Sequence, residues 1–334
     1  MRLLVLGGTV FLGRAVVEHA LSAGHDVTTF NRGRTRGDRP GVLAVRGDRT
    51  RPADVEALAA SGTWDLVVDT SGYVPAVVVT SARALADRAA RYVLVSSISV
   101  YPGFPTERID ASSPVHACPP DAEEAEYGPG KAGSERAVVE AFGDRAMLAR
   151  AGLLLGPHEN VGRLTWWLRR IARGGDVLAP GRPDLPIQVV DARDVAAYLC
   201  EARLSGPVNV TSPPGSSTYG AMLDACVNAT GSDARLSWVP DEVVLQHGVA
   251  PWSELPLWAP ENDEFAHVWD VEADPARETG LRVRPLARTV TDTWMAMQHE
   301  DPVVTPGITD RHGIDPTKER AVLDAWAARL AERR

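Results

Sequence analysis

Short apolar runs alternate with stretches of helical apolar spacing along the first 155 residues. The run Leu3 to Leu6 ends in Gly7-Gly8, and from Phe11 onward apolar residues recur with the period of a helix until Gly24. A second apolar run, Val27 to Phe30, completes a strand, helix, strand unit. Because such units build parallel sheets covered by helices on both faces, the pattern predicts an α/β fold with a doubly wound sheet of the Rossmann type.

The same periodicities predict the remaining elements and their division into lobes. Further strands are expected at residues 43–45, 66–68, 92–95, 147–155, 186–190 and 208–210, and helices at residues 55–60, 77–90, 127–142, 195–202 and 219–229. We expect a dinucleotide-binding domain over residues 1–155, to which residues 187–212 return, and a smaller C-terminal lobe over residues 156–300 that binds substrate. Residues 301–334 form a tail with a helix, which docks on its own chain or on a partner subunit.

The glycine turn after the first strand suggests binding of a pyrophosphate. A diphosphate needs unobstructed backbone N–H groups and the positive end of a helix, and Gly7, Gly8 and Gly13 leave room for both. Val10 stands where a three-glycine fingerprint has its middle glycine, so its side chain must point away from the phosphates. A glycine turn can also be a purely structural device, and the turn alone does not name a cofactor.

Basic residues follow the second strand, where the dinucleotide fold usually carries an acid. Such an acid accepts hydrogen bonds from the adenosine ribose of NAD(H), whereas an arginine pairs with the 2′-phosphate of NADP(H). Asn31, Arg32 and Arg34 occupy this region, which favours NADP(H), with NAD(H) as the alternative. The alternative explanation for these basic residues is a solvated surface loop that binds no cofactor. Asp48, just past the third strand, is placed to accept from the adenine amine, although a surface turn explains it nearly as well.

Small and hydroxylated residues follow the fourth and fifth strands. Thr70, Ser71 and Gly72 stand at the carboxyl end of the fourth strand, where ribose and nicotinamide would lie against the backbone. Ser97 and Ser99 follow the fifth strand. The carboxyl edge of an α/β sheet is where active sites form, but serines also satisfy backbone groups in turns.

Tyr127 and Lys131 form a Tyr-x-x-x-Lys pair at the head of a predicted helix. Positions i and i+4 lie on one helical face, so the phenol and the ammonium can meet at one site. With six tyrosines and two lysines in 334 residues, chance gives such a pair in about one of 28 chains of this composition. A phenol is a weak acid or base at neutral pH, and a nearby ammonium lowers its pKa toward the working range.

Charge and cysteine content exclude several other kinds of protein. The net charge is −9, which argues against nucleic acid or an anionic membrane as the main partner. The three cysteines contain no C-x-x-C pair, so neither a disulfide framework nor a metal site is expected. No apolar run approaches the length of a membrane span. A cytoplasmic protein with a small-molecule substrate is therefore expected, and a dimer is plausible.

Three motifs stand out in the sequence: the Gly-Gly-Thr-x-Phe-Leu-Gly turn, the Ser-Ser-x-Ser-Val-Tyr segment and the Tyr-x-x-x-Lys pair. Their order and spacing resemble those of the extended or atypical short-chain dehydrogenases/reductases, the NAD-dependent epimerase/dehydratase superfamily. The resemblance covers about residues 1 to 300 and implies a catalytic triad of Ser97, Tyr127 and Lys131. In that family the tyrosine is the general acid or base. The lysine holds the nicotinamide ribose and lowers the tyrosine pKa, and the serine hydrogen-bonds the substrate oxygen.

The resemblance also implies a cofactor site. Gly7, Gly8 and Gly13 correspond to pyrophosphate contacts, Arg32 to the 2′-phosphate contact and Asp48 to the adenine contact. The complete set of expected cofactor-binding residues is Gly7, Gly8, Thr9, Phe11, Leu12, Gly13, Asn31, Arg32, Arg34, Asp48, Thr70, Ser71, Gly72 and Lys131. Val10 and the Asn-Arg after the second strand depart from the common pattern, which bears on cofactor choice more than on the fold.

The substrate site is less defined by the sequence. Eight of the nine tryptophans lie after residue 165, which suggests an aromatic pocket in the second lobe, although core packing explains buried tryptophans equally well. Candidate substrate contacts are Tyr73, Ser99, Arg163, Trp167, Trp252 and Trp258.

Three functions compete. The first is an NADP(H)-dependent oxidoreductase that acts on a small carbonyl or alcohol. The second is a sugar-nucleotide epimerase or dehydratase with tightly bound NAD, whose relatives commonly carry an asparagine where this chain has Leu153-Leu154-Leu155-Gly156-Pro157. The third is a non-catalytic, cofactor-sensing or RNA-associated protein on the same scaffold, which the presence of all three triad residues opposes.

Overall fold

The computed structural model describes residues 1–300, 303 and 312–332. The chain divides into two compact units. The first contains residues 1–154, 192–213 and 271–283, and the second contains residues 155–191, 214–270 and 284–334. Residues 271–283, which we expected in the C-terminal lobe, therefore belong to the first unit. Residues 187–191, which we expected to return to the dinucleotide-binding domain, belong to the second.

A seven-stranded sheet forms the centre of the first unit. Its strands are β1 (Arg2–Leu6), β2 (Asp26–Asn31), β3 (Leu43–Arg46), β4 (Trp64–Asp69), β5 (Ala89–Ser97), β6 (Ala146–Ala151) and β11 (Gly206–Val210). They lie in the order β11-β6-β5-β4-β1-β2-β3, and every pair is parallel. This order reverses direction between β1 and β4, as in a doubly wound Rossmann sheet, so the predicted fold class is confirmed.

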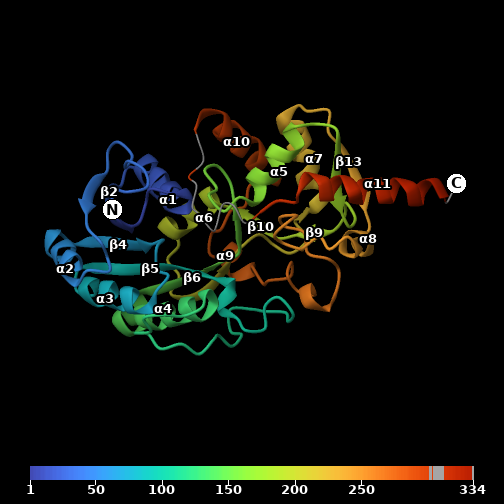
Figure 1. Cartoon of the computed structure of the whole chain (residues 1–334). Helices are drawn as coiled ribbons and strands as arrows, with labels where there is room; N and C mark the ends of the chain where they lie inside the picture. The colour runs from blue at the N-terminus through green and yellow to red at the C-terminus, as the bar shows by residue number, and fades with distance from the viewer. Residues whose placement is uncertain (301–302, 304–311, 333–334) are drawn as a thin grey trace. The chain divides into compact units, whose positions relative to one another are not determined.

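Helices cover both faces of this sheet. They are α1 (Phe11–Ser22), α2 (Pro52–Ser61), α3 (Pro75–Leu85), α4 (Tyr127–Phe142), α6 (Ala192–Glu201) and α9 (Asp274–Glu278), with short 3-10 turns η1 (Ile98–Val100) and η2 (Gly143–Arg145). Figure 1 shows α2, α3 and α4 along one side of the sheet, while α1 packs against α6 on the other. Leu3 to Leu6 are almost completely buried, because a central parallel strand contacts helices on both faces.

Several predicted boundaries were wrong, among them the strand expected at 186–190, which is divided into β9 (Pro186–Ile187) and β10 (Val189–Asp191). The strand expected at 147–155 is interrupted at Gly152, where a side chain would lie 2.6 Å from Thr211 Oγ1; β7 (Leu153–Leu155) follows it. The helix expected to reach residue 90 ends at Leu85. Ala89 favours a helix by propensity, but it pairs with Trp64 in the sheet, and the pairing of β4 with β5 outweighs that preference.

The second unit contains short strands and five helices within its described residues. The strands are β8 (Asp176–Pro180), β9 (Pro186–Ile187), β10 (Val189–Asp191), β12 (Ser217–Thr218) and β13 (Arg235–Val239). The helices are α5 (Arg163–Ala172), α7 (Tyr219–Thr230), α8 (Asp241–Gln246), α10 (Leu286–His299) and α11 (Pro316–Glu332), with the 3-10 turn η3 (Asp263–Phe265). Strand β8 pairs in parallel with β13, and α5 and α10 both pack on α7.

The tail helix α11 docks on its own chain within the second unit. The Glu319 carboxylate accepts hydrogen bonds from Arg170 Nε at 2.8 and 2.9 Å and from the backbone N–H of Leu178 at 3.2 Å. Val322 is fully buried, whereas Leu330 near the end of the helix is exposed. A buried ion pair therefore fixes the first turns of α11. Most of the loop predicted before it lies outside the described residues.

No helix within the described part of the chain is both long enough and apolar enough to cross a membrane.

Replacing Glu319 by alanine should destabilise the second unit by about 3–5 kcal/mol, because it leaves the buried Arg170 guanidinium without its carboxylate. Asp324→Ala on the exposed side of the same helix is the matched control and should change stability by less than about 0.5 kcal/mol. Urea denaturation followed by tryptophan fluorescence measures both, since eight of the nine tryptophans lie in the second unit. Equal stabilities would show that the ion pair does not anchor the tail.

Candidate active site

The turn after β1 is built to approach a ligand closely. Gly7 has a φ of +108°, which disfavours any side chain, and a Cβ there would lie 2.7 Å from Thr70 Oγ1. A Cβ on Gly13 would lie 2.8 Å from the Gly8 nitrogen. The turn before α1 therefore consists largely of backbone without side chains, which leaves the room that a diphosphate requires beside the N-terminus of this helix.

The N-terminus of α1 is available to an anion. Val10 is its N-cap residue and has extended backbone; no side chain among the described residues caps the helix there. The positive end of a twelve-residue helix is therefore left with uncapped N–H groups beside the glycine turn. Phe11 and Leu12 are buried in the first turn, and Thr9 is half-buried in the loop before it. These residues fit the diphosphate of a dinucleotide.

The residues after β4 pack against the glycine turn. Thr70 Oγ1 and Ser71 Oγ donate to the Leu6 carbonyl at 3.1 and 3.2 Å. The Gly72 carbonyl accepts a hydrogen bond from Lys131 Nζ at 2.8 Å. The three small residues predicted for the cofactor site therefore connect the glycine turn to Lys131.

A buried ion pair lies beneath these residues, and sequence reasoning missed it. Arg49 holds Asp69 through two hydrogen bonds of 2.8 Å, and the Tyr92 hydroxyl donates to the same carboxylate at 2.8 Å. Burial opposes the charge on Asp69, but Arg49 outweighs it and the pKa of Asp69 is lowered. Arg49 Nη1 also donates to Ser71 Oγ at 2.9 Å. The pair therefore fixes the loop at the carboxyl end of β4.

Lys131 is a buried cation held by backbone carbonyls. Its side chain is 3% exposed, and Nζ donates to the carbonyls of Gly72 at 2.8 Å and Val95 at 2.9 Å. Among the described residues it has no carboxylate partner within ion-pair distance. Burial lowers the pKa of Lys131 to about 8, with Asp69 opposing this shift. Keeping such a charge buried without an ion pair is costly, which is typical of a functional residue.

Two phenol rings flank the Lys131 ammonium. Nζ lies 4.6 Å from the centroid of the Tyr73 ring and 5.9 Å from that of Tyr127. Tyr127 is 55% exposed and Tyr73 60% exposed, so both rings present a free face. The structure thus brings both tyrosines to one cation.

The serines after β5 turn toward the start of α4. Ser97 Oγ accepts from the Ser99 N–H at 3.1 Å, and the two hydroxyls lie 3.1 Å apart. The Ser99 carbonyl packs against Gly128, beside Tyr127, so closely that no side chain would fit there. Ser97, Ser99 and Tyr127 therefore gather at one edge of the sheet, next to Lys131.

A second buried ion pair supports this edge and was also missed. Glu135, one turn after Lys131, pairs with Arg150 on β6 through bonds of 2.8 and 3.0 Å. Ser96 Oγ donates to the same carboxylate at 2.6 Å, and Arg150 Nη1 donates to the Tyr101 hydroxyl at 2.8 Å. Glu135 is therefore occupied by Arg150 and Ser96 instead of Lys131.

The residues predicted for the adenosine end lie after β2 and β3. Asn31 Nδ2 donates to the Gly7 carbonyl at 3.3 Å, which places this side chain beside the glycine turn. Arg32 and Arg34 are exposed. Asp48 accepts two hydrogen bonds from Thr50, at 2.8 and 3.1 Å, and these bonds lower its pKa. Asp48 is thus engaged as a turn residue.

The tryptophans proposed for the substrate pocket are mostly core residues of the second unit. Trp167 and Trp258 are completely buried, and their indole N–H groups donate to Pro256 O at 2.7 Å and Asp241 Oδ1 at 2.9 Å. This burial argues against the predicted role of both as walls of an open pocket. Trp252 is partly exposed and lies against Trp269, with 5.6 Å between ring centroids. Arg163 begins α5, where its N–H donates to Glu159.

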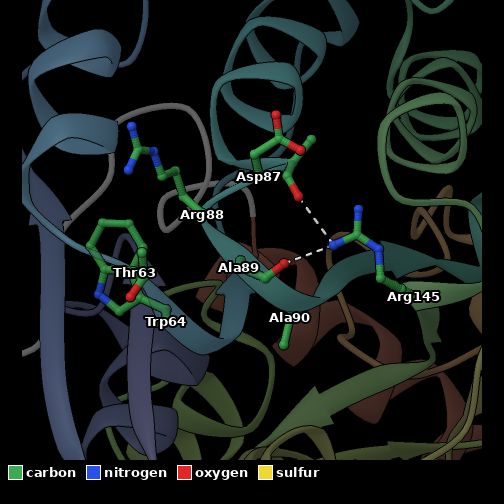
Figure 2. A pocket seen from close by; sticks show the side chains of 8 residues that line it. Thr63, Trp64, Asp87, Arg88, Ala89, Ala90 and Arg145 are labelled. Carbon is green, nitrogen blue, oxygen red and sulfur yellow. Dashed lines mark hydrogen bonds between the residues drawn. The ribbon is translucent and has the colours of Figure 1, made fainter.

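A surface pocket of about 430 Å³ lies at the opposite edge of the sheet, at the amino ends of β4 and β5. Figure 2 shows Arg145 reaching toward the Ala89 carbonyl. Arg145 Nη1 donates to the carbonyls of Ala86 and Ala89 at 3.1 and 2.8 Å. Its lining residues are Thr63, Trp64, Ala86, Asp87, Arg88, Ala89, Ala90 and Arg145. Because open α/β sheets bind ligands at the carboxyl ends of their strands, we assign this pocket no part in catalysis.

Comparisons with known proteins bear on the family and the fold of the chain. The model of the NAD dependent epimerase/dehydratase family matches residues 3–205. The 2′-dehydrokanamycin reductase of Streptomyces kanamyceticus is 31% identical over 210 residues, which are 60% of this chain and 57% of that protein. The match thus spans little more than half the length of that relative.

Solved structures of epimerases share the fold. The UDP-glucose 4-epimerase of Thermus thermophilus, in complex with NAD, has a TM-score of 0.64 at 18% identity and covers 90% of this chain and 99% of its own. The Bordetella bronchiseptica enzyme WbmH, in complex with NAD⁺, has a TM-score of 0.65 at 17% identity and covers 89% of this chain and 98% of its own.

Lysine NMR tests the state of Lys131, because the chain contains only two lysines, Lys131 and Lys318. In nucleotide-free protein with ¹³C-labelled lysine, the Lys131 side-chain signal should titrate with a pKa of about 8. A Lys318→Arg variant leaves one lysine and assigns the signal. A midpoint near the ordinary lysine value of about 10.4 would contradict the buried, unpaired ammonium.

Stability should depend on pH through the same residue. The pKa of Lys131 is about 8 in the folded protein and 10.5 without its surroundings, so between these values the unfolded chain binds more protons. Stability should therefore rise as pH increases through this window, and Lys131→Met should remove this contribution. Urea denaturation of both proteins at pH 7.5 and pH 10.5 measures the difference. A stability gap between the two proteins that does not change with pH would oppose the assignment.

Proposed function

The chain belongs to the NAD dependent epimerase/dehydratase family, and we propose that within it the protein is an NADP(H)-dependent oxidoreductase that acts on a small carbonyl or alcohol. The observation that carries this proposal is the buried Lys131 ammonium, which is held by two carbonyls and flanked by exposed phenols. Such a cation can stabilise a phenolate, and a phenol that loses its proton readily can donate it to a substrate oxygen.

Each residue of the triad has a separate task in the proposed reduction. NADPH, held at the glycine turn of Gly7, Gly8 and Gly13, would supply a hydride to the carbonyl carbon. Ser97 Oγ donates a hydrogen bond to the carbonyl oxygen, which orients the substrate and stabilises the negative charge that develops there. Tyr127 then transfers its phenolic proton to this oxygen to give the alcohol. Lys131 stabilises the resulting phenolate, and the reverse sequence oxidises an alcohol.

A reductase is also supported by the relative from S. kanamyceticus, whose name states that it reduces 2′-dehydrokanamycin. The match covers 57% of that protein, so its substrate serves here as one compound of a test panel. The choice of NADP(H) rests on the arginines after β2 and on the absence of an acid at the end of that strand.

The alternative is an epimerase that keeps its cofactor bound and regenerates it in each cycle. Family membership and the NAD-bound epimerases of the same fold support this alternative, although identities below 20% show the fold alone. The leucines at Leu153–Leu155 stand where sugar-nucleotide relatives commonly have an asparagine, which favours the oxidoreductase.

Tyr127→Phe should lower turnover about 10²- to 10⁴-fold, because the ring loses the proton that it donates. NADPH affinity should stay within about threefold, since the ring itself remains. Tyr73→Phe is the matched control, because it removes the other phenol beside Lys131 and should retain most activity. Absorbance at 340 nm with a panel of carbonyl compounds, 2′-dehydrokanamycin included, measures turnover. The roles of the two tyrosines would be reversed if Tyr73→Phe lost activity and Tyr127→Phe kept it.

Freshly purified protein should carry little nucleotide and should bind NADPH reversibly and more tightly than NADH. A reductase must release its oxidised cofactor after each turnover, whereas an epimerase need not. Denaturing release followed by mass spectrometry identifies any bound nucleotide, and fluorescence titration of the emptied protein compares the two affinities. Stoichiometric bound NAD⁺ would favour the epimerase and would refute the role proposed for the arginines.

A further inference from the structure

An acid does lie beside the end of β2, although the residues that end this strand in the sequence, Asn31 and Arg32, include none. Asp38 comes from the loop between β2 and β3, seven residues after Asn31. Its Oδ1 accepts hydrogen bonds from Thr29 Oγ1 at 2.6 Å and from Asn31 Nδ2 at 3.0 Å. The same Asn31 nitrogen reaches the Gly7 carbonyl. Asp38 therefore lies at the point where the dinucleotide fold receives the adenosine ribose.

Arg46, the last residue of β3, neutralises this acid. Its Nη2 is paired with Asp38 Oδ2, and its Nη1 donates to Asn31 Oδ1 at 2.9 Å. Asn31 and Arg46 are also direct partners in the pairing of β2 with β3. Burial opposes the charge on Asp38, but hydrogen bonds from Arg46, Thr29 and Asn31 outweigh it and lower the pKa. Both partners are thus charged at neutral pH.

The guanidinium of Arg46 is fixed in place yet accessible. Its stem crosses Gly33, where a Cβ would lie 2.9 Å from Nε, so a larger residue at this turn would displace the arginine. Its side chain is 47% exposed, whereas that of Asp38 is 9% exposed. An incoming anion would therefore meet the arginine before the carboxylate. A guanidinium has five N–H donors, and these two contacts leave several for a phosphate.

Three other arginines of this loop, Arg32, Arg34 and Arg39, are less suited to the task. Arg39 pairs with Glu18 at 3.2 Å. Arg32 and Arg34 are exposed, and no hydrogen bond or ion pair to a described residue holds either in place, although the charge of Arg32 helps to lower the pKa of Asp48. A side chain that is not held in place must be immobilised when it binds a ligand, at a cost in conformational entropy, whereas Arg46 is already fixed.

We propose that Arg46, oriented by Asp38 and Asn31, is the residue that selects NADPH over NADH through the 2′-phosphate. The inference rests on the proposed binding of NADP(H) and assigns its selectivity to a residue other than Arg32. Arg46 has two effects: its charge attracts the phosphate, and it cancels the charge of Asp38, which would otherwise repel the phosphate. Loss of Arg46 therefore removes an attraction and exposes a repulsion.

Arg46→Ala should weaken NADPH binding about 10- to 100-fold, as expected for the loss of a charge-assisted phosphate contact, and should leave NADH binding within about threefold. Adding Asp38→Asn to this variant should restore part of the NADPH affinity, because the exposed carboxylate is removed. Arg46→Lys keeps the charge without the fork that holds Asn31 and Asp38, and should fall between the wild type and Arg46→Ala. Arg83→Ala on α3, whose side chain is 67% exposed, is the exposed-arginine control and should change neither affinity by more than about threefold.

Calorimetric titration of adenosine 2′,5′-bisphosphate against 5′-AMP isolates the 2′-phosphate, and fluorescence titration of NADPH and NADH tests the whole cofactor. Circular dichroism and thermal melting establish that each variant is folded. An Arg46→Ala protein that is folded and keeps the wild-type ratio of the two affinities would overturn the inference while leaving NADP(H) binding intact. The same holds if only Arg32→Ala changes the ratio. Wild-type protein that binds neither nucleotide would overturn the proposed function and this inference with it.

Discussion

The candidate active site depends on a cation that is buried without a carboxylate of its own. Two acids approach Lys131, and each is already bound by an arginine: Asp69 by Arg49 and Glu135 by Arg150. Asp69 and Glu135 still favour the charged lysine electrostatically, but burial outweighs them and lowers its pKa to about 8. Because the arginines occupy both acids, the ammonium is left to the backbone carbonyls and the phenols. Its charge is therefore directed at the groups that would exchange a proton with a substrate.

The two ion pairs also connect the segments that form the site. Arg49 follows β3 and binds the end of β4, while Arg150 lies on β6 and binds the middle of α4. A buried ion pair adds little net stability compared with apolar packing, but loss of one partner leaves an uncompensated charge that costs about 3–5 kcal/mol. Each pair thus enforces one arrangement of its segments more than it stabilises the fold. The result is that Gly72 and Val95 stay at hydrogen-bonding distance from Lys131.

The sequence predicted what depends on local periodicity and missed what depends on contacts between distant segments. The helix 127–142 was predicted with the bounds of α4, since glycine, proline and helical spacing are signals within one segment. Tyr127 and Lys131 were found because they are four residues apart on that helix. Arg49 and Asp69 are twenty residues apart on different segments, and both read as ordinary loop and strand residues until the sheet joins them. Trp167 and Trp258 show the opposite error, because an aromatic-rich composition does not distinguish a core from a pocket.

The cofactor end illustrates the same limit with a chemical consequence. A sequence motif considers only the residue at the end of β2, and by that criterion the acid that binds the adenosine ribose in NAD(H)-dependent relatives is missing. In the folded protein, Asp38 from the loop after β2 lies against Asn31 at the end of that strand. Arg46 from the neighbouring strand β3 is paired with Asp38. The electrostatic attraction of a ligand to this site depends on the charges of both Asp38 and Arg46 and on how exposed each side chain is, and not on one residue alone. Since the arginine is the more exposed partner and the acid is already neutralised, the site presents a net attraction to an anion. Selectivity for a phosphorylated ribose can thus arise in a loop that contains a carboxylate, provided that the carboxylate serves to hold the arginine.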